Sequence, residues 1–419
     1  MEVRMNSLER FDYNDKAVLL RVDVNSPIDP QTRKIVNENR IKKSIPTIQY
    51  LLDQGAKLAI IAHQGDTLDY QNLMSMREHA EKLSAHLGQT ITYVEDVCGP
   101  AAVAAIKALK PGEAIFLGNL RYLTEEVSGF EKEVKLTAKE MLETWLVRTL
   151  APLFDVYVND AFAAAHRNCP SMVAFQELLP TAGGRLLYDE YEALYKVLNG
   201  AAKPAVFVLG GAKISDAFGM MKTVLENGTA DKILASGVTG VIMLLAQGIK
   251  VGAKYEQFLK DKDLMVFVEP AREMLRDFPG RIEVPSDLAY EVDGQRVNTG
   301  LDALPMDDKM FLDIGSDTMT RYDAIIQTAG TIFVNGPAGV YENPLFEEGT
   351  KSLWNSIANA PGYSVIGGGD TVSAASKYID LKKINYVCTA GGAMVRFMSG
   401  KKLPLIEAME AAYERDGKG

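Results

Sequence analysis

Short apolar runs alternate with amphipathic segments along most of the chain. In the first half, four runs have the length and composition of buried strands: 18–24, 58–62, 114–117 and 156–158. The segments that begin at Arg40 and His79 repeat their apolar residues at helical spacing, and both end in glycine, as helix C-termini commonly do. This alternation predicts βαβ units and a parallel sheet that is covered by helices on both faces.

The same alternation resumes after a long helical stretch that starts at about Gly184. The later strands are expected at 206–211, 232–235, 264–268, 331–336, 363–369 and 385–392. The pattern is least informative between about Pro285 and Asp308, which is richer in polar residues. Two series of parallel-sheet units predict an α/β protein of two doubly wound domains, 1–183 and 202–401, joined by a hinge helix over 184–201.

The composition and net charge of the chain argue against several classes of function. The chain has 419 residues, of which 47% are hydrophobic, and a formal net charge of −10, which argues against nonspecific nucleic-acid binding and against an anionic membrane surface. Three widely spaced cysteines predict reduced thiols, and no Cys/His spacing is typical of a zinc site. No stretch of 18 apolar residues occurs. We therefore expect a soluble cytoplasmic protein.

One stretch combines three signals of an anion site. In Y-S-V-I-G-G-G-D-T, residues 363–371, a buried strand is followed by three glycines and then by a helical pattern. Backbone N–H groups and the helix dipole would both point at a ligand there. The carboxylate of Asp370 would repel a phosphate unless a cation lay between them, which suggests a Mg²⁺ ligand. The alternative is a tight turn with an aspartate N-cap.

The predicted strand ends of the two halves differ in chemistry, and ligands of parallel sheets bind at those ends. The first half carries arginines there, which suit phosphate and carboxylate and predict a pocket for a small, doubly anionic molecule; a solvated surface charge is the alternative for each one. The second half carries five glycine-rich turns, at 210–213, 236–240, 335–342, 367–371 and 390–392. With Lys213, these turns predict a nucleotide triphosphate site, although a Walker A motif is absent from the sequence.

An anion pocket in one domain and a nucleotide site in the other predict hinge closure and phosphoryl transfer. A carboxylate acceptor is already ionised at neutral pH and needs no general base. That fits a chain with four histidines. A dehydrogenase is a poor fit, because no G-x-G-x-x-G follows the first strand of either half.

Several long motifs carry a family resemblance. The chain contains R-V-D-V-N-S-P, N-E-N-R-I, V-N-D-A-F-A-A-A-H-R, V-L-G-G-A-K-I-S-D, V-N-G-P-A-G-V-Y-E, V-I-G-G-G-D-T and T-A-G-G-A in this order. It resembles phosphoglycerate kinase from end to end, in the style of the archaeal branch. The resemblance implies that ATP and 3-phosphoglycerate are exchanged for ADP and 1,3-bisphosphoglycerate, with Mg²⁺.

The resemblance also implies which residues form each site. The residues matching the phosphoglycerate site and its surroundings are Arg21, Asp23, Val24, Asn25, Arg40, His63, Gln64, Gly65, Asp66, Arg121, His166 and Arg167. Those matching the nucleotide site are Gly211, Lys213, Gly237, Asn335, Pro337, Gly339, Glu342, Gly368, Gly369, Asp370 and Thr371, with Asp370 next to the metal. Those matching groups that act on the transferred phosphoryl are Arg40, Lys213, Gly391 and Gly392. The segment 402–419 is expected to return to the N-terminal domain, and the protein to be a monomer, with a dimer as the alternative.

The chain also departs from the family pattern. Asp66 stands where an arginine usually helps to hold the acceptor, and Ala217 stands where many members have a phosphate-contacting lysine. Phe311 replaces a glycine near the adenine pocket. Two further hypotheses therefore stay open beside phosphoglycerate kinase: an acyl-phosphate-forming kinase with a different carboxylate acceptor, and a nucleotide-binding protein without catalysis.

Overall fold

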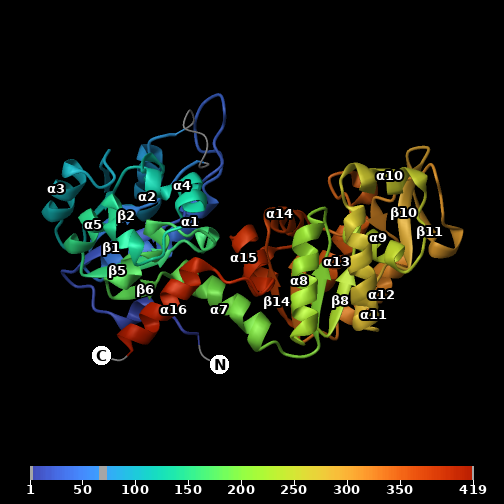
Figure 1. Cartoon of the computed structure of the whole chain (residues 1–419). Helices are drawn as coiled ribbons and strands as arrows, with labels where there is room; N and C mark the ends of the chain where they lie inside the picture. The colour runs from blue at the N-terminus through green and yellow to red at the C-terminus, as the bar shows by residue number, and fades with distance from the viewer. Residues whose placement is uncertain (1–2, 66–72, 418–419) are drawn as a thin grey trace. The chain divides into compact units, whose positions relative to one another are not determined.

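A computed structural model describes residues 3–65 and 73–417. Two compact units emerge from it, and the division between them falls within α7 (Arg185–Asn199). One unit takes in the chain up to Glu192 together with the segment from Lys402 on, and the other runs from Ala193 to Lys401 (Figure 1). No helix among the described residues is both long and apolar enough to cross a membrane.

The first unit is built on a six-stranded parallel sheet in the order β3-β4-β2-β1-β5-β6. The strands are β1 (Ala17–Val22), β2 (Lys57–Ile61), β3 (Ile91–Tyr93), β4 (Ala114–Phe116), β5 (Val156–Asp160) and β6 (Thr181–Gly183). The helices are α1 (Asn39–Asp53), α2 (Arg77–Leu87), α3 (Pro100–Ala108), α4 (Ser128–Val134), α5 (Trp145–Leu150), α6 (Pro170–Val173) and α16 (Pro404–Asp416). This confirms the doubly wound parallel sheet expected for the first half.

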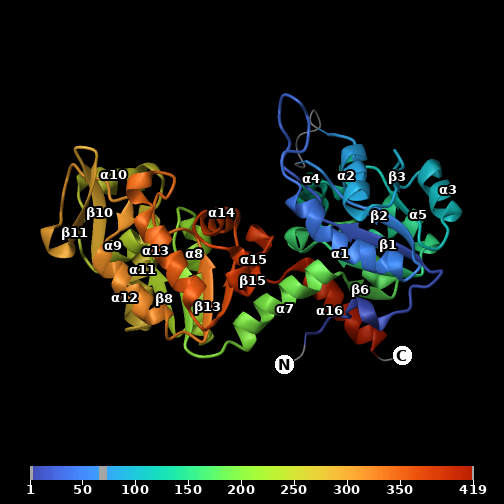
Figure 2. The ribbon, with the colours of Figure 1, turned by 180° about the vertical axis from the view of Figure 1, so that it is seen from behind.

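The core of this sheet explains why its strands are apolar throughout. Helix α1 covers one face of this sheet (Figure 2), where Val18 and Leu20 pack in one core cluster with Ile48. Leu19, which alternates to the other face, is equally buried. A strand buried on both faces needs no polar alternation. The helix that begins near His79 ends as expected, because Gly88 adopts the left-handed conformation at its C-terminus (φ 66°).

The second unit repeats the design with a parallel sheet in the order β15-β14-β13-β7-β8-β9. The strands are β7 (Ala205–Leu209), β8 (Lys232–Ala235), β9 (Ile282–Glu283), β13 (Thr331–Asn335), β14 (Tyr363–Ile366) and β15 (Tyr386–Val387). The helices are α8 (Ile214–Glu226), α9 (Gly237–Ala246), α10 (Ala253–Asp261), α11 (Val268–Asp277), α12 (Ser316–Ile326), α13 (Glu348–Asn359), α14 (Gly369–Tyr378) and α15 (Gly391–Met398). The parallel sheet predicted for the second half is thus confirmed as well.

Two features of this unit differ from the sequence reading. The strand expected at 264–268 is wrong: residues Met265–Phe267 form a 3₁₀ turn that leads into α11, and Val266 is 68% exposed. A short apolar run cannot by itself separate strand from helix, and Pro270 fits the first turn of α11. The polar segment after Pro285 forms an antiparallel hairpin of β10 (Asp287–Val292) and β11 (Gln295–Gly300), which pairs with β12 (Asp313–Ile314).

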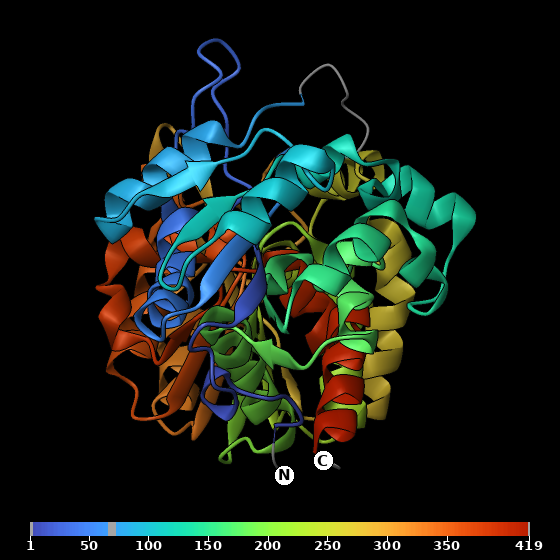
Figure 3. The same cartoon turned by 90° about the vertical axis from the view of Figure 1, so that its left-hand side faces the viewer.

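The C-terminal helix α16 belongs to the first unit. It lies beside α6 and β6 (Figure 3), and its residues Leu405 and Met409 are buried. The backbone N–H of Leu405 donates to the carbonyl of Ala165 at 3.2 Å, and Arg415 Nη2 donates to the carbonyl of Leu179 at 2.8 Å. The last helix of the chain therefore completes the packing of a unit that begins hundreds of residues earlier.

Candidate active site

Parallel pairing brings the polar residues of the first unit to one edge of its sheet. In the pairing of β1 with its neighbours, Arg21 lies opposite Ile61 of β2 and Asn159 of β5. Residues just beyond these positions, including Asp23 and His63, therefore emerge from the same edge. This is the edge at which parallel α/β sheets bind ligands.

His63 lies at the centre of an arginine cluster. It is buried, and Arg21 Nη2 donates to its Nδ1 at 2.8 Å. Burial holds the pKa of His63 well below 6.5, and the positive charges of Arg21, Arg121, Arg167 and Arg40 lower it further. The imidazole is neutral at physiological pH, with Nδ1 as an acceptor and the proton on Nε2. The structure thus brings together His63 and all four arginines that the sequence singled out.

Acidic and carbonyl groups hold these arginines in place. Arg40 Nη1 lies 2.8 Å from Asp23, and Arg167 Nε lies 2.6 Å from Glu131 on α4. Arg121 Nη1 donates to the carbonyl of Glu126, and burial lowers the pKa of Arg121 to about 10. The sequence analysis missed Glu126 and Glu131, although both follow Arg121 within one short acidic segment.

Three buried guanidinium nitrogens of this arginine cluster have no hydrogen-bond partner within the described part of the chain. They are Nε of Arg21, Nε of Arg121 and Nη2 of Arg167. A buried donor without an acceptor is costly, so an arrangement of this kind suits an anion that supplies acceptor oxygens.

A hydrogen-bonded corner joins the turns after β1 and β2. The Gln64 side chain accepts from Ser26 N at 2.8 Å and donates to Ser26 O at 2.9 Å. Gly65 N donates to Asn25 Oδ1 at 3.1 Å, while Val24 is fully buried below. His79 of α2, which the sequence indicated only as part of an amphipathic helix, bonds Gln64 Oε1 at 2.9 Å.

Two further residues were expected at this site. His166 is half-buried, on the segment between β5 and α6. Asp66 lies outside the described residues.

The second unit contains a pocket of about 370 Å³ at the carboxyl ends of its strands. All eleven residues expected at the nucleotide site line it: Gly211, Lys213, Gly237, Asn335, Pro337, Gly339, Glu342, Gly368, Gly369, Asp370 and Thr371. They come from four separate stretches of sequence, and the sheet brings them to one wall.

The glycines of this pocket allow conformations and contacts that a side chain would prevent. Gly211, Gly237 and Gly368 have φ of 75°, 55° and 97°, and they lead into α8, α9 and α14. Three helix N-termini therefore face one space, which is an arrangement suited to phosphate. Thr371 Oγ1 accepts from Gly336 N at 2.8 Å and so ties the turn of α14 to the neighbouring one.

Lys213 and Asp370 face each other at the open side of the pocket. Lys213 Nζ lies 3.6 Å from the Asp370 carboxylate, and their side chains are 75% and 72% exposed. No group of three or more His, Cys, Asp or Glu side chains that could hold a metal occurs in the described ranges. A single exposed carboxylate fits Mg²⁺, which is typically held by one or two carboxylates together with substrate phosphates.

Gly391 and Gly392 lie next to the pocket and do not line it. They begin α15, and a Cβ on Gly391 would lie 3.2 Å from Gly368 Cα. The N-terminus of α15 therefore approaches the turn that precedes α14.

The far end of the pocket is apolar. Tyr255, Phe258, Leu288, Met310 and Phe311 line it, and the rings of Tyr255 and Phe311 lie 6.2 Å apart. The pocket thus has a polar end of backbone N–H groups and an end suited to a flat apolar group. Of these residues, the sequence analysis named only Phe311.

Known proteins resemble this chain over almost its whole length. A sequence model of the family described as phosphoglycerate kinase matches residues 8–401. The phosphoglycerate kinase of Methanothermus fervidus is 40% identical over 98% of both chains, and that of Methanococcus maripaludis is 42% identical over 98% of this chain and 99% of its own.

Solved structures agree with the sequence relatives. The crystal structure of phosphoglycerate kinase from Pyrococcus horikoshii has a TM-score of 0.85 at 38% identity, and it covers 98% of this chain and 100% of its own. The phosphoglycerate kinase of Coxiella burnetii has a TM-score of 0.81 at 31% identity, with 97% and 98% covered. On the agreement of family model, relatives and fold, the chain belongs to the phosphoglycerate kinase family.

Proposed function

We propose that this protein catalyses the reversible transfer of the γ-phosphoryl group of ATP to the carboxylate of 3-phosphoglycerate, giving 1,3-bisphosphoglycerate and ADP. The proposal rests on one observation: this member of the phosphoglycerate kinase family contains both an arginine cluster around His63 in its first unit and a pocket with helix N-termini in its second unit. A neutral histidine among four arginines suits a phosphorylated carboxylic acid, and a pocket with three helix N-termini and an apolar end suits a nucleotide.

In this proposal the catalytic groups act by position and charge. Arg40, held by Asp23, and the mobile Lys213 offset negative charge on the transferring phosphoryl, and the N-termini near Gly368 and Gly391 add backbone donors. The acceptor carboxylate is ionised at neutral pH, so His63 binds and orients as a neutral ring and removes no proton. Mg²⁺, bound with the nucleotide beside Asp370, would offset the charge of the phosphate oxygens.

The transfer also requires that acceptor and nucleotide meet. The two sites are assigned to different units, so we propose that α7 acts as the hinge for closure. We further propose that the protein works in the cytoplasm on small molecules, since all three of its cysteines are buried free thiols.

A coupled assay tests the activity directly. We expect ADP formation from ATP to require both 3-phosphoglycerate and Mg²⁺. Folded protein that binds ADP but gives no turnover with both present would refute the proposal and favour a binding protein without catalysis. Ala217 does not support that alternative by itself, because it is buried in α8 and does not line the pocket.

A panel of carboxylates in the same assay tests the acceptor. The unusual Asp66 is the reason to include other acids. A clear preference for 3-phosphoglycerate would exclude a different acceptor, and calorimetry on Asp66→Arg would show whether the altered corner weakens its binding.

A further inference from the structure

A buried carboxylate lies at the apolar end of the nucleotide pocket. Asp313 has a fully buried side chain, and it lines that end together with Phe311 and Leu312, the two residues before it. It accepts from Gly349 N at 2.7 Å and from Ile314 N at 3.0 Å. Burial raises its pKa to about 6, although these bonds and Arg296 act in the opposite direction.

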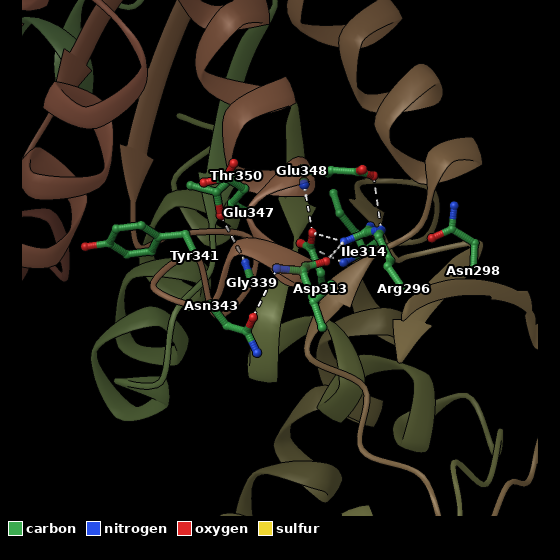
Figure 4. Close-up of polar contacts among 12 residues, drawn as sticks. Arg296, Asn298, Asp313, Ile314, Gly339, Tyr341, Asn343, Glu347, Glu348 and Thr350 are labelled. Atoms are coloured by element: carbon green, nitrogen blue, oxygen red, sulfur yellow. Dashed lines mark hydrogen bonds and ion pairs between the residues drawn. The ribbon is translucent and has the colours of Figure 1, made fainter. Parts of the chain in front are cut away.

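Arg296 reaches this carboxylate from the neighbouring hairpin. Its side chain on β11 is 10% exposed, and Nη1 donates to Asp313 at 2.8 Å (Figure 4). Nη1 also donates to Leu345 O at 3.1 Å, and Nη2 to Ile314 O at 2.7 Å. One guanidinium therefore joins β11, β12 and the turn that leads into α13, and Glu348 at the start of α13 lies 3.1 Å from its Nε.

The segments joined in this way form two walls of the pocket. Val340 N donates to Leu312 O at 2.8 Å. Gly339 N donates to Thr350 Oγ1 at 3.2 Å (Figure 4). Gly339 packs so closely on Asp313 that a Cβ there would lie 2.4 Å from the carboxylate. The ion pair of Arg296 and Asp313 therefore holds both walls: the one that carries Phe311 and the one that carries Val340 and Glu342.

We propose that Arg296 and Asp313 form a positioning pair that sets the spacing of the walls around the nucleoside part of the nucleotide. This inference rests on the proposed function, because it assigns the apolar end to the base. Arg296 does not line the pocket, so it acts through Asp313 and the backbone it holds. The phosphate end is built from other turns, so the pair affects binding of the nucleoside and not of the phosphates.

Calorimetry with two probes separates this role from general stabilisation. In the presence of Mg²⁺, ADP reports on both ends of the pocket, and pyrophosphate only on the turns at the N-termini of α8, α9 and α14. For Arg296→Met we expect ADP to bind at least tenfold more weakly, with pyrophosphate affinity within about twofold of wild type. Arg296→Lys keeps the positive charge but loses the planar fork of donors, and it should recover part of the ADP affinity.

Arg321→Met is the matched control. Arg321 lies on α12 of the same unit, and it bonds Glu283 at 2.9 Å and the carbonyl of Val284, away from the pocket. Its loss should lower the thermal midpoint and leave ADP affinity unchanged. If Arg296→Met does not fold, Asp313→Asn, which keeps the shape of the side chain, should show the same selective loss of ADP affinity.

Two results would overturn the proposal: wild-type ADP affinity in folded Arg296→Met, or equal losses of ADP and pyrophosphate affinity. If the wild-type protein itself binds no ADP, the proposed function fails as well, which is distinguishable from an effect seen only in the variants.

Discussion

The surroundings of Lys213 indicate that this residue contributes little to the stability of the fold. Its side chain is 75% exposed, and its ion pair with Asp370 spans 3.6 Å between two exposed groups, so it contributes little to stability. An exposed cation at the open side of a pocket lined by helix N-termini is suited to phosphate. We therefore propose that Lys213 acts in phosphate binding and transfer.

Substitution of this lysine should separate activity from folding. We expect Lys213→Ala to lower kcat by about 100-fold or more, the range seen when one donor to transition-state charge is lost, without changing the thermal midpoint. Lys222→Ala is the control, because Lys222 is a 67% exposed lysine on α8, the helix that Lys213 precedes, and it pairs with Glu226. Full activity of Lys213→Ala in the coupled assay would show that its role is misassigned.

Protonation of the buried His79 makes the free energy of unfolding depend on pH. Burial lowers its pKa from 6.5 to about 4, so as pH falls the unfolded chain takes up this proton first. The free energy of unfolding therefore decreases once the pH drops below about 6.5, and the decrease continues to about pH 4. At pH 5 this single group destabilises the fold by about 2 kcal/mol relative to neutral pH.

His79→Gln tests this sign, since glutamine can still donate to Gln64 but does not titrate. Between pH 7.5 and pH 5, urea unfolding should show a loss of stability that is about 2 kcal/mol smaller in the variant than in wild type. Equal losses in both proteins would mean that His79 is not a buried neutral residue.

At the scale of elements, the turn before α14 shows why three glycines in a row are not equivalent. Gly368 has φ of 97°, and a Cβ there would lie 3.0 Å from Asn335 Nδ2. Gly369, the first residue of the helix, has no atom within 4 Å of such a Cβ. The strand-to-helix turn therefore requires glycine at 368 and only tolerates it at 369.

Alanine at each position tests the difference. We expect Gly368→Ala to cost about 1–3 kcal/mol of unfolding free energy, because the backbone is forced into a region that side chains avoid. Gly369→Ala should be neutral or slightly stabilising by the same urea titration. If both variants lost the same stability, the strain at Gly368 would be refuted.

The elements that the sequence missed had signals of unequal strength. The hairpin of β10 and β11 turns at Asp293-Gly294, both with positive φ, which is the two-residue turn that the dipeptide Asp-Gly favours. That signal could have been used. The run at 264–268 carried no comparable signal, because its length and apolar composition fit strand and helix equally.

At the scale of the whole molecule, α16 shows how a distant segment completes a core. Met409 is 1% exposed, and its sulfur lies 3.8 Å from Gln176 Nε2.

Met409→Ala should lower the stability of the first unit by about 2–5 kcal/mol through lost burial and a cavity. Differential scanning calorimetry would measure this loss, and Ala411→Ser, on the exposed face of the same helix, should cause none. An unchanged profile for Met409→Ala would contradict this packing.

The sequence by itself determined the class of fold and the chemistry of each half. An alternation of buried strands with amphipathic helices is stable as a parallel sheet that is covered by helices. In such a sheet the carboxyl ends of all strands lie at one edge. Arginines at those ends in one half and glycines in the other were therefore sufficient to predict two anion sites, and the motifs were sufficient to identify the family.

Only the tertiary structure decided which groups hold those sites in shape. Glu131 against Arg167, His79 against Gln64 and Arg296 against Asp313 are pairs between separate elements, at distances of 2.6, 2.9 and 2.8 Å. The local sequence does not predict such pairs, because the pattern of polar and apolar residues around each partner reflects only its own helix or strand. Burial then shifts the pKa of a group such as His63 or Asp313, and burial is a property of the packed chain alone.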